Sequence, residues 1–439
     1  MRKRKLLIIP LLLSGLMCLT GCADFIKDIF TEDDLTFTNK YNPPVSTPTA
    51  NPDAVIARGV EAVYNEKTPN AYCFKSIGYA NEDGLIPNTY KDGAINHVEY
   101  NVNGGEDYNG STSGNNYDLY VPKDLNKNEK HVAILFIHGG AWISGFKTDV
   151  NEYVHEFANR GYITATIKYS LLKRTMDNPS LSIFRNLDEI DACISSIKLA
   201  LEDLEFDTTK TNLVIGGASS GAHLSMLYAY SRGQRAALPI SFLVDAVGPV
   251  DIKPANWKSF TNMNEEQYNT ALNEGLSYEK IEALRANGNL RDLRVADTGD
   301  PYYWNEYHTM RIANGMCGIP FSLEDVKAAT DENEEAIVNP NAASTSLTKD
   351  GGGEDQLSVT YWINSSYKLP IICAYAGKDA VVGVAQYAVL EKALIDNDIE
   401  HSMFYFKNSN HTDITKEFDE TAYTGFVNKI ASECEKILL

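Results

Sequence analysis

The sequence predicts an α/β fold, a three-layer sandwich in which helices cover both faces of a mostly parallel central sheet. From about residue 96 onward, short apolar runs alternate with segments that have helical spacing. The apolar runs are rich in β-branched residues and carry little polar alternation, which is typical of parallel strands buried on both faces. Strands that alternate with helices in this way indicate a parallel sheet whose faces are covered by the helices that connect its strands.

The predicted elements follow one another along the chain. Two alternating runs, INHVEYNV at 95–102 and YDLYVP at 117–122, predict an antiparallel start to the sheet. Helical spacing predicts helices at 150–161, near 184–204 and directly after Ser219. The apolar runs predict further strands at 131–138, 162–170, 211–218, 241–249, 369–376 and 401–406.

The composition is that of a globular protein. The chain has 439 residues, of which 44% are hydrophobic and 22% charged, enough for one large core or two modest ones. The formal net charge of -20 makes the chain a poor binder of nucleic acid, so no nucleic-acid partner is expected. After residue 21 no apolar run approaches the ~20 residues that a membrane-spanning helix needs.

The N-terminus has the features of an export signal. Four basic residues at 2–5 precede an apolar run from Leu6 to Leu19. The following LTGC is similar to the lipobox of bacterial lipoproteins, a resemblance that implies acylation of Cys22. An uncleaved anchor and an ordinary signal cut elsewhere are the alternatives. All three predict export from the cytoplasm.

The export signal sets the predicted domain boundaries. Residues 1–21 are the expected signal peptide, and residues 22–55 are rich in Pro, Thr, Asn and Asp in their second half. Such a segment has little apolar surface to bury and predicts a tether. Residues 56–439 form the predicted folded domain, with membrane contact through the N-terminal lipid only.

The cysteines outside the signal region give no C-x-x-C pair. Metal binding is therefore unsupported, and no metal or organic cofactor is expected. Cys193 and Cys373 lie in apolar patterns and are expected to be small core residues. No disulfide is predicted for the five cysteines, which are Cys73, Cys193, Cys317, Cys373 and Cys434.

The segment 217–221, Gly-Ala-Ser-Ser-Gly, fits G-x-S-x-G at the junction of a predicted strand and a predicted helix. At such a junction the central residue, Ser219, must adopt a strained backbone conformation. Flanking glycines remove side chains that would collide with the neighbouring strand and helix. The strain directs Oγ of Ser219 out of the sheet, which predicts a nucleophile. A structural glycine turn or a phosphate loop is the alternative.

A second glycine motif, HGGAW at 138–142, directly follows the strand predicted at 131–138. An acyl-transfer site needs backbone N–H groups directed at the oxygen that becomes negative. We expect Gly139, Gly140 and the N–H of Ser220 to form this oxyanion hole. The alternative is a tight turn in which Trp142 packs into the core.

These motifs resemble those of α/β-hydrolases in the hormone-sensitive-lipase-like and acetyl or feruloyl esterase group. Together with YDLYVP, GYITATIKYSL, AGKDAVV at 376–382 and a final histidine, they cover about residues 95–437. The resemblance implies a serine esterase whose triad follows the order Ser, acid, His. HGGA replaces the usual HGGG, and Ala218 and Ser220 replace the Asp and Ala that commonly flank the nucleophile. Both departures bear on substrate preference more than on catalysis.

The acid of the triad is expected after the next-to-last strand. Asp379, in the loop after the strand at 369–376, is the best candidate, unless it only caps a helix. Asp251 follows the preceding strand and is the second candidate. Glu391 lies too deep in the following helix.

The base is expected to be His411, which follows the strand at 401–406 and precedes the last helix. A loop at this position lets an imidazole meet both Ser219 and Asp379. His223 is expected to pack inside the helix after the nucleophile, and His138 to shape the glycine loop. The remaining candidates are structural or lid residues: His97, His131, His401 and His308.

The resemblance also implies a cap, formed by the insertion at about 252–368. Its aromatics Tyr302, Tyr303 and Trp304 either line a substrate pocket or form the core of the cap itself. The predicted activity is hydrolysis of small acyl esters through an acyl-enzyme, with acetyl or feruloyl esters of carbohydrates implied by the resemblance alone. A peptidase or amidase on the same fold, and a surface binding protein on an inactive scaffold, are the alternatives.

Overall fold

The computed structural model describes a defined part of the chain, residues 55–79, 85–86, 100–101, 116–142, 145–171, 183–251, 261–262, 291–292, 354–379, 381–382 and 385–439. The predicted signal peptide, Cys22 and all of the tether except Val55 lie outside these residues. Most of the predicted cap also lies outside them, so it stays a prediction. The same holds for His97, Tyr302, Tyr303, Trp304, His308 and Cys317.

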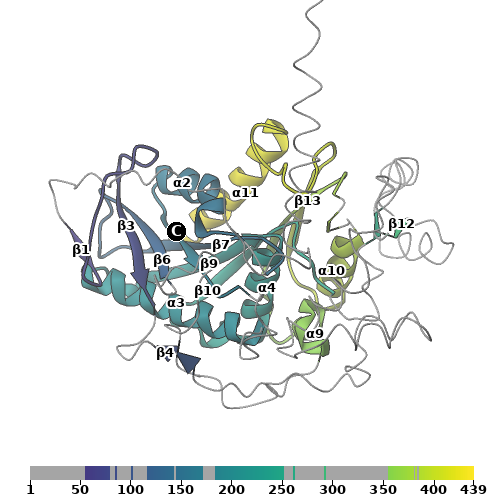
Figure 1. The fold of residues 1–439 in the computed structure, drawn as a ribbon, viewed down its shortest axis with the longest axis horizontal. Coiled ribbons are helices and arrows are strands. Elements are labelled where there is room, and N and C mark those ends of the chain that lie inside the picture. Colours follow the sequence, from purple (N-terminus) through teal and green to yellow (C-terminus); the bar gives the residue numbers. More distant parts are fainter. Residues whose placement is uncertain are drawn as a thin grey trace, which may run out of the picture.

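The centre of the fold is an eight-stranded sheet (Figure 1). Its first six strands in spatial order are parallel, and the last two are antiparallel to their neighbours. The mostly parallel sheet and the six strands predicted from apolar runs are therefore confirmed. The spatial order is β14 (His401–Phe406), β13 (Ile371–Ala376), β10 (Ile240–Ala246), β9 (Thr211–Ala218), β7 (His131–Ile137), β8 (Ile163–Lys168), β6 (Asn116–Pro122) and β3 (Ala71–Gly78).

Helices cover both faces of this sheet, as Figure 1 shows. On one face lie α2 (Asn151–Asn159) and α11 (Glu420–Leu438); on the other lie α3 (Ile183–Asp203), α4 (Ser220–Arg232) and α10 (Ala385–Asp396). The three helices predicted from spacing are confirmed as α2, α3 and α4. The short elements are β1 (Ile56–Ala57), β2 (Val60–Glu61), β4 (Leu85–Ile86), β5 (Tyr100–Asn101), β11 (Thr261–Asn262), β12 (Arg291–Asp292), η2 (Lys147–Val150), η4 (Thr208–Lys210), η5 (Gly233–Arg235), η7 (Glu354–Leu357) and α9 (Val359–Trp362).

The strand β7 shows why an apolar run without alternation belongs in the middle of such a sheet. Successive strand residues point to opposite faces. Ile134 and Phe136 pack into the core beneath α2 and α11, whereas Leu135 and Ile137 pack into the core beneath α3 and α4. Every residue of β7 is buried, because both faces of the strand are covered.

The antiparallel start of the sheet differs from the prediction. The strand predicted at 117–122 is present as β6, but its antiparallel neighbours are β3 and β8. Of the run at 95–102 only Tyr100 and Asn101 are described, and they pair with β4 outside the main sheet. A register shift after Phe74 and a positive φ of 58° at Ser76 interrupt β3. These irregularities break the period of two by which a strand is recognised in sequence.

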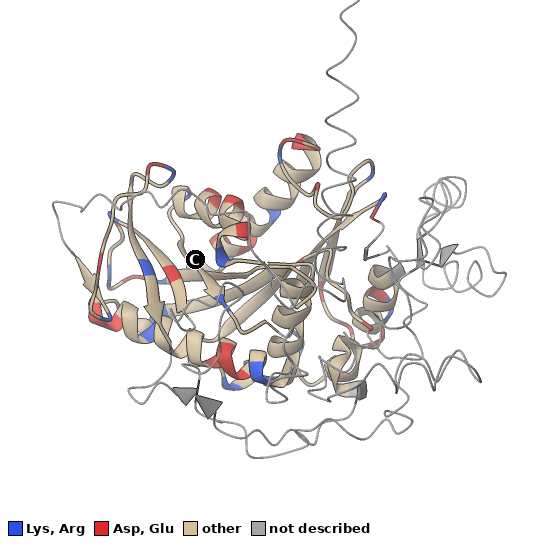
Figure 2. Cartoon of the chain, in the orientation of Figure 1, with Lys and Arg blue, Asp and Glu red and all other residues tan. Residues whose placement is uncertain are grey.

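Charged residues of both signs are spread over the helices and loops, and few lie in the central strands (Figure 2). Asp118 in β6 is an exception, with 1% of its surface exposed. It accepts hydrogen bonds from Lys147 at 2.7 Å and Lys75 at 2.9 Å. Burial alone would raise the pKa of Asp118, but the two ammonium groups outweigh it and hold this pKa below its usual value. The network ties β3 and β6 to η2.

Four cysteines, Cys73, Cys193, Cys373 and Cys434, are buried as free thiols. Burial raises the pKa of each thiol, which keeps it protonated and unreactive. None of these four described cysteines forms a disulfide in the structure. Among the helices of the described residues, none combines the length and the apolar character needed to span a membrane.

Asp245 in β10 gives a testable pH dependence. Its side chain is fully buried, and burial raises its pKa to about 7. Between pH ~4 and ~7 the unfolded chain has released this proton while the folded chain retains it, so stability falls by about 1.4 kcal/mol per pH unit as the pH rises. Asparagine does not ionise. We therefore expect the Asp245→Asn variant to gain stability relative to the wild type across this window, measured by urea unfolding at several pH values.

The control for this experiment is Asp118→Asn. The pKa of Asp118 lies below its usual value in the folded chain. Its contribution to stability therefore changes only at pH values below the window of pH ~4 to ~7. Its stability difference from the wild type should be large but flat between pH 4 and 7. A flat difference for Asp245→Asn as well would contradict the prediction.

Candidate active site

Ser219 occupies the turn between β9 and α4. Its φ of 54° and ψ of -125° lie in a region that residues other than glycine rarely adopt. The backbone N–H of Ser219 donates to the carbonyl of Ala246 at 2.8 Å, and its carbonyl accepts the N–H of His223 at 3.0 Å. The neighbouring strand and the helix thus hold the strained residue from both sides.

The two glycines of the motif are required by close backbone contacts. A Cβ at Gly217 would lie 2.5 Å from the carbonyl oxygen of Ile137 and 2.5 Å from the backbone of Gly221. A Cβ at Gly221 would lie 2.1 Å from the same oxygen of Ile137. No side chain fits at these distances, so β7, β9 and α4 can converge at the serine only if both positions are glycine.

The structure brings together the three residues predicted as nucleophile, base and acid. Nε2 of His411 lies 2.8 Å from Oγ of Ser219, and Nδ1 of His411 lies 2.6 Å from Oδ2 of Asp379. An ionised carboxylate only accepts hydrogen bonds, so Nδ1 carries the proton and Nε2 is left to accept the serine hydroxyl. The three residues follow the ends of β9, β13 and β14, which are joined by parallel pairing through β10 and therefore end at one edge of the sheet.

Asp379 is held from two directions. Its side chain has 2% of its surface exposed, and Oδ1 accepts the backbone N–H groups of Val381 at 2.7 Å and Val382 at 2.8 Å. The capping role considered from the sequence and the contact with His411 thus use different oxygens of one carboxylate. The other two acids have different partners: Asp251 accepts a hydrogen bond from Ser358 at 3.2 Å, and Glu391 accepts one from Tyr387 at 3.0 Å.

The glycine loop after β7 passes directly beside the nucleophile. A Cβ at Gly139 would lie 3.1 Å from Cβ of Ser219, so the backbone of the loop contacts the serine closely. Positive φ values continue through Gly140 (117°), Ala141 (51°) and Trp142 (62°). Ser220 begins α4, where backbone N–H groups have no acceptor within the helix. Of the residues predicted for the oxyanion hole, Gly139 therefore lies beside Ser219 and Ser220 follows it directly, while Gly140 continues the same loop.

His138 shapes this loop, as predicted. Its ring is buried, and Nδ1 donates to the carbonyl of Gly139 at 2.8 Å. The ring stacks on Tyr169 at 4.3 Å between centroids, and burial lowers the pKa of His138 to about 4. His138 is therefore neutral at neutral pH. His131 and His401 lie in β7 and β14, at the opposite ends of these strands from the loop and from His411.

One supporting residue has no signal in the sequence. The hydroxyl of Tyr153 in α2 donates to the carbonyl of Ile414 at 2.7 Å, three residues beyond His411. The Tyr153 ring stacks on Phe136 of β7, with centroids 5.5 Å apart. The contact joins residues 261 positions apart. No local pattern could have indicated it.

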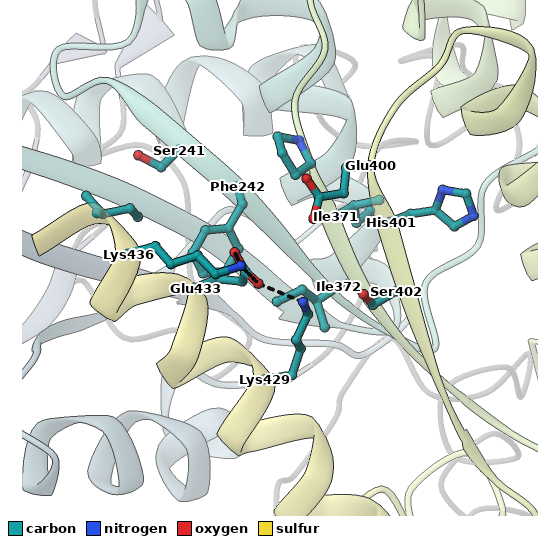
Figure 3. Close-up of a pocket in the computed structure, with 12 residues that line it drawn as sticks. Ser241, Phe242, Ile371, Ile372, Glu400, His401, Ser402, Lys429, Glu433 and Lys436 are labelled. Atoms are coloured by element: carbon teal, nitrogen blue, oxygen red, sulfur yellow. Dashed lines mark hydrogen bonds and ion pairs between the residues drawn. The ribbon is translucent and has the colours of Figure 1, made fainter. Parts of the chain in front are cut away.

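A cavity of about 160 Å³ lies at the opposite edge of the sheet (Figure 3). It is bordered by the first residues of β10, β13 and β14, whereas Ser219 follows the last residue of β9. At its rim, Glu433 of α11 pairs with Lys429 and Lys436. This cavity is separate from the Ser219 site. Among the residues that the structure describes, no group of three or more His, Cys, Asp or Glu side chains is placed to hold a metal ion.

Comparison with known proteins gives one family match. Residues 117–287 match the model of the BD-FAE family, a family of esterases. A segment of 144 residues, 32% of this chain, is 29% identical to the non-reducing polyketide synthase adrD of Penicillium roqueforti. This segment spans only 6% of the length of that synthase.

Solved structures of similar fold include several esterases. Esterase B of Lactobacillus Rhamnosis aligns with a TM-score of 0.49 at 11% identity, covering 84% of this chain and 87% of its own. A truncated carbohydrate esterase from gut microbiota aligns with a TM-score of 0.48 at 13% identity, covering 85% of this chain and 99% of its own. The sheet order and the strained serine turn are those of an α/β-hydrolase fold, and residues 117–287 within it are similar to the BD-FAE family of esterases.

Proposed function

We propose that this chain hydrolyses small acyl esters through an acyl-enzyme formed on Ser219. One observation carries the proposal: His411 contacts Oγ of Ser219 at 2.8 Å through one ring nitrogen and Asp379 at 2.6 Å through the other. A serine hydroxyl is a weak nucleophile unless a base removes its proton as it attacks. The observed contacts supply that base and fix its tautomer.

In the first half of the reaction, Oγ of Ser219 attacks the ester carbonyl carbon while Nε2 of His411 takes the hydroxyl proton. Asp379 stabilises the imidazolium that results. The carbonyl oxygen becomes negative and is stabilised by the N–H groups of Gly139, Gly140 and Ser220. His411 then gives its proton to the alcohol oxygen as the C–O bond breaks. The alcohol leaves, and the acyl group stays on Ser219.

In the second half, water attacks the acyl carbon and gives one proton to Nε2 of His411. The bond between the acyl group and Oγ breaks, and His411 returns the proton to Ser219. The carboxylic acid is released and the starting state is restored. These steps consume one water for each ester and require no other reactant.

The substrate class proposed is that of acetyl or feruloyl esters of carbohydrates. The BD-FAE match over residues 117–287 supports it, as does the resemblance of HGGAW and GGASSGAHLS to the esterase motifs. We further propose that the chain is exported and anchored by a lipid on Cys22, with residues 22–55 as a tether. Metabolic labelling of the wild type and a Cys22→Ala variant with an alkyne fatty acid tests the anchor.

A fluorophosphonate probe tests the mechanism. Labelling of the wild type at Ser219, located by peptide mass spectrometry, is expected for a serine hydrolase. Absence of labelling would favour a binding protein on an inactive scaffold. Substrate class is then read from p-nitrophenyl esters of increasing chain length, acetylated xylan and an aminoacyl anilide. Turnover of the anilide above the esters would favour an amidase.

A further inference from the structure

A buried histidine links the glycine loop to the helix that follows the nucleophile. Nε1 of Trp142 donates to Nδ1 of His223 at 3.2 Å, and Nε2 of His223 donates to the carbonyl of Leu357 at 2.8 Å. The two rings meet edge to face at 5.3 Å between centroids. Trp142 has 4% of its surface exposed and His223 has none. Water therefore does not compete for these hydrogen bonds.

The partners of His223 determine which ring nitrogen carries the proton. The indole of Trp142 can only donate, so Nδ1 must be an acceptor. The carbonyl of Leu357 can only accept, so Nε2 must be the donor. Burial lowers the pKa of His223 to about 4, which keeps the ring neutral at neutral pH. The neutral Nε2–H tautomer is thus the single state that satisfies both contacts.

The loop that this histidine holds is strained. Ala141 and Trp142 both have positive φ values, 51° and 62°, although neither is glycine. Such conformations persist only where the surroundings hold them in place. The Trp142 side chain is one such restraint, and it immediately follows the segment that carries Gly139 and Gly140.

His223 also acts on the nucleophile and on a third segment. Its backbone N–H donates to the carbonyl of Ser219 at 3.0 Å. The carbonyl of Leu357, which accepts the hydrogen bond from the His223 side chain, belongs to the last residue of η7. Two residues later, the N–H of Val359 donates to the carbonyl of Val250 at 2.8 Å. His223 therefore connects three parts of the chain: the turn at Ser219, the glycine loop after β7, and the segment that begins with η7 and leads to β13.

We propose that His223 is a positioning residue that, through Trp142, sets the backbone of the oxyanion hole relative to Ser219. The inference rests on the proposed ester hydrolysis, since it assigns the hydrogen bond a role in that reaction. Its effect should fall on the transition state and not on substrate binding, because negative charge develops on the carbonyl oxygen only as Ser219 attacks.

The test uses Trp142→Phe, His223→Phe and the double variant. Displacing oxyanion donors without deleting them should lower kcat for p-nitrophenyl acetate by about 10- to 100-fold, with KM changed less than threefold. Affinity for a boronic acid transition-state analogue should fall in parallel with kcat/KM. The double variant should resemble the worse single variant, because both changes remove the same hydrogen bond. His223→Gln, which retains one acceptor and one donor, should recover part of the loss.

His131→Phe is the matched control. His131 is also buried, also bonds to a backbone carbonyl, that of Asn126 at 2.9 Å, and also meets an aromatic ring edge to face, that of Phe206. It lies at the far end of β7, so its replacement should lower the melting temperature and leave kcat unchanged. If Trp142→Phe and His223→Phe behave like this control, the inference is wrong although ester hydrolysis stands. A wild type that labels with no probe and turns over no ester would overturn both.

Discussion

Ser219→Ala should lower kcat for p-nitrophenyl acetate by about 10⁶-fold, the largest effect expected from any single substitution in this chain. Alanine removes the oxygen that forms the acyl-enzyme, and the backbone N–H groups around it remain. The residual rate should still exceed that of the uncatalysed reaction because the oxyanion hole acts without the serine. Initial rates at high enzyme concentration measure both the fall in kcat and the residual rate. Fluorophosphonate titration gives the concentration of active sites needed for kcat.

Ser225→Ala is the control for this substitution. Ser225 lies in the same helix, and its buried hydroxyl donates to the carbonyl of Gly221 at 2.6 Å. Its loss should change stability slightly and leave kcat within a few-fold of the wild type. Retention of more than a tenth of wild-type turnover by Ser219→Ala would rule out the acyl-enzyme on this residue.

The second large effect is expected for Asp379→Asn, with kcat lowered by about 10⁴-fold. The asparagine oxygen can still accept the N–H groups of Val381 and Val382, so the loop keeps its shape. The amide nitrogen, however, would donate to Nδ1 of His411. The ring would then carry its proton on Nε2 and could no longer accept the proton of Ser219. Single-turnover acylation rates measure the effect directly.

Asp251→Asn tests the assignment of the acid. Asp251 was the second candidate from the sequence, and its carboxylate accepts a hydrogen bond from Ser358. Its replacement should leave kcat within a few-fold of the wild type. A loss equal to that of Asp379→Asn would require a different acid in the mechanism.

Local patterns in the sequence were sufficient to predict most of the sheet and the nucleophile turn. A parallel strand such as β7 is buried on both faces, so its apolar run is continuous and easily recognised. The turn at Ser219 needs glycines at fixed spacing, which makes it a short motif. His411 and Asp379 could be chosen because each follows one of the last two predicted strands, in the order Ser, acid, His that the resemblance to α/β-hydrolases implies.

The features that escaped prediction depend on contacts between distant residues. The strand β3 is interrupted at Ser76, and its place in the sheet comes from pairing with β6, which follows it at a distance in the sequence, from Gly78 paired with Asn116 to Ala71 paired with Pro122. The hydrogen bond from Trp142 to His223 joins residues 81 positions apart. Only the assembled fold defines such contacts, because neither residue carries a local mark of its partner.

The position of β14 in the sheet has a consequence for inactivation. Among the described strands it pairs with β13 alone, and most of its side chains are half-buried. Strands at the margin of a sheet open at lower free energy than those at its centre. Opening of β14 would separate His411 from Ser219, while β7 and β10 still hold the serine in place. The catalyst would therefore switch off reversibly under mild heating or denaturant while the bulk of the protein remained folded.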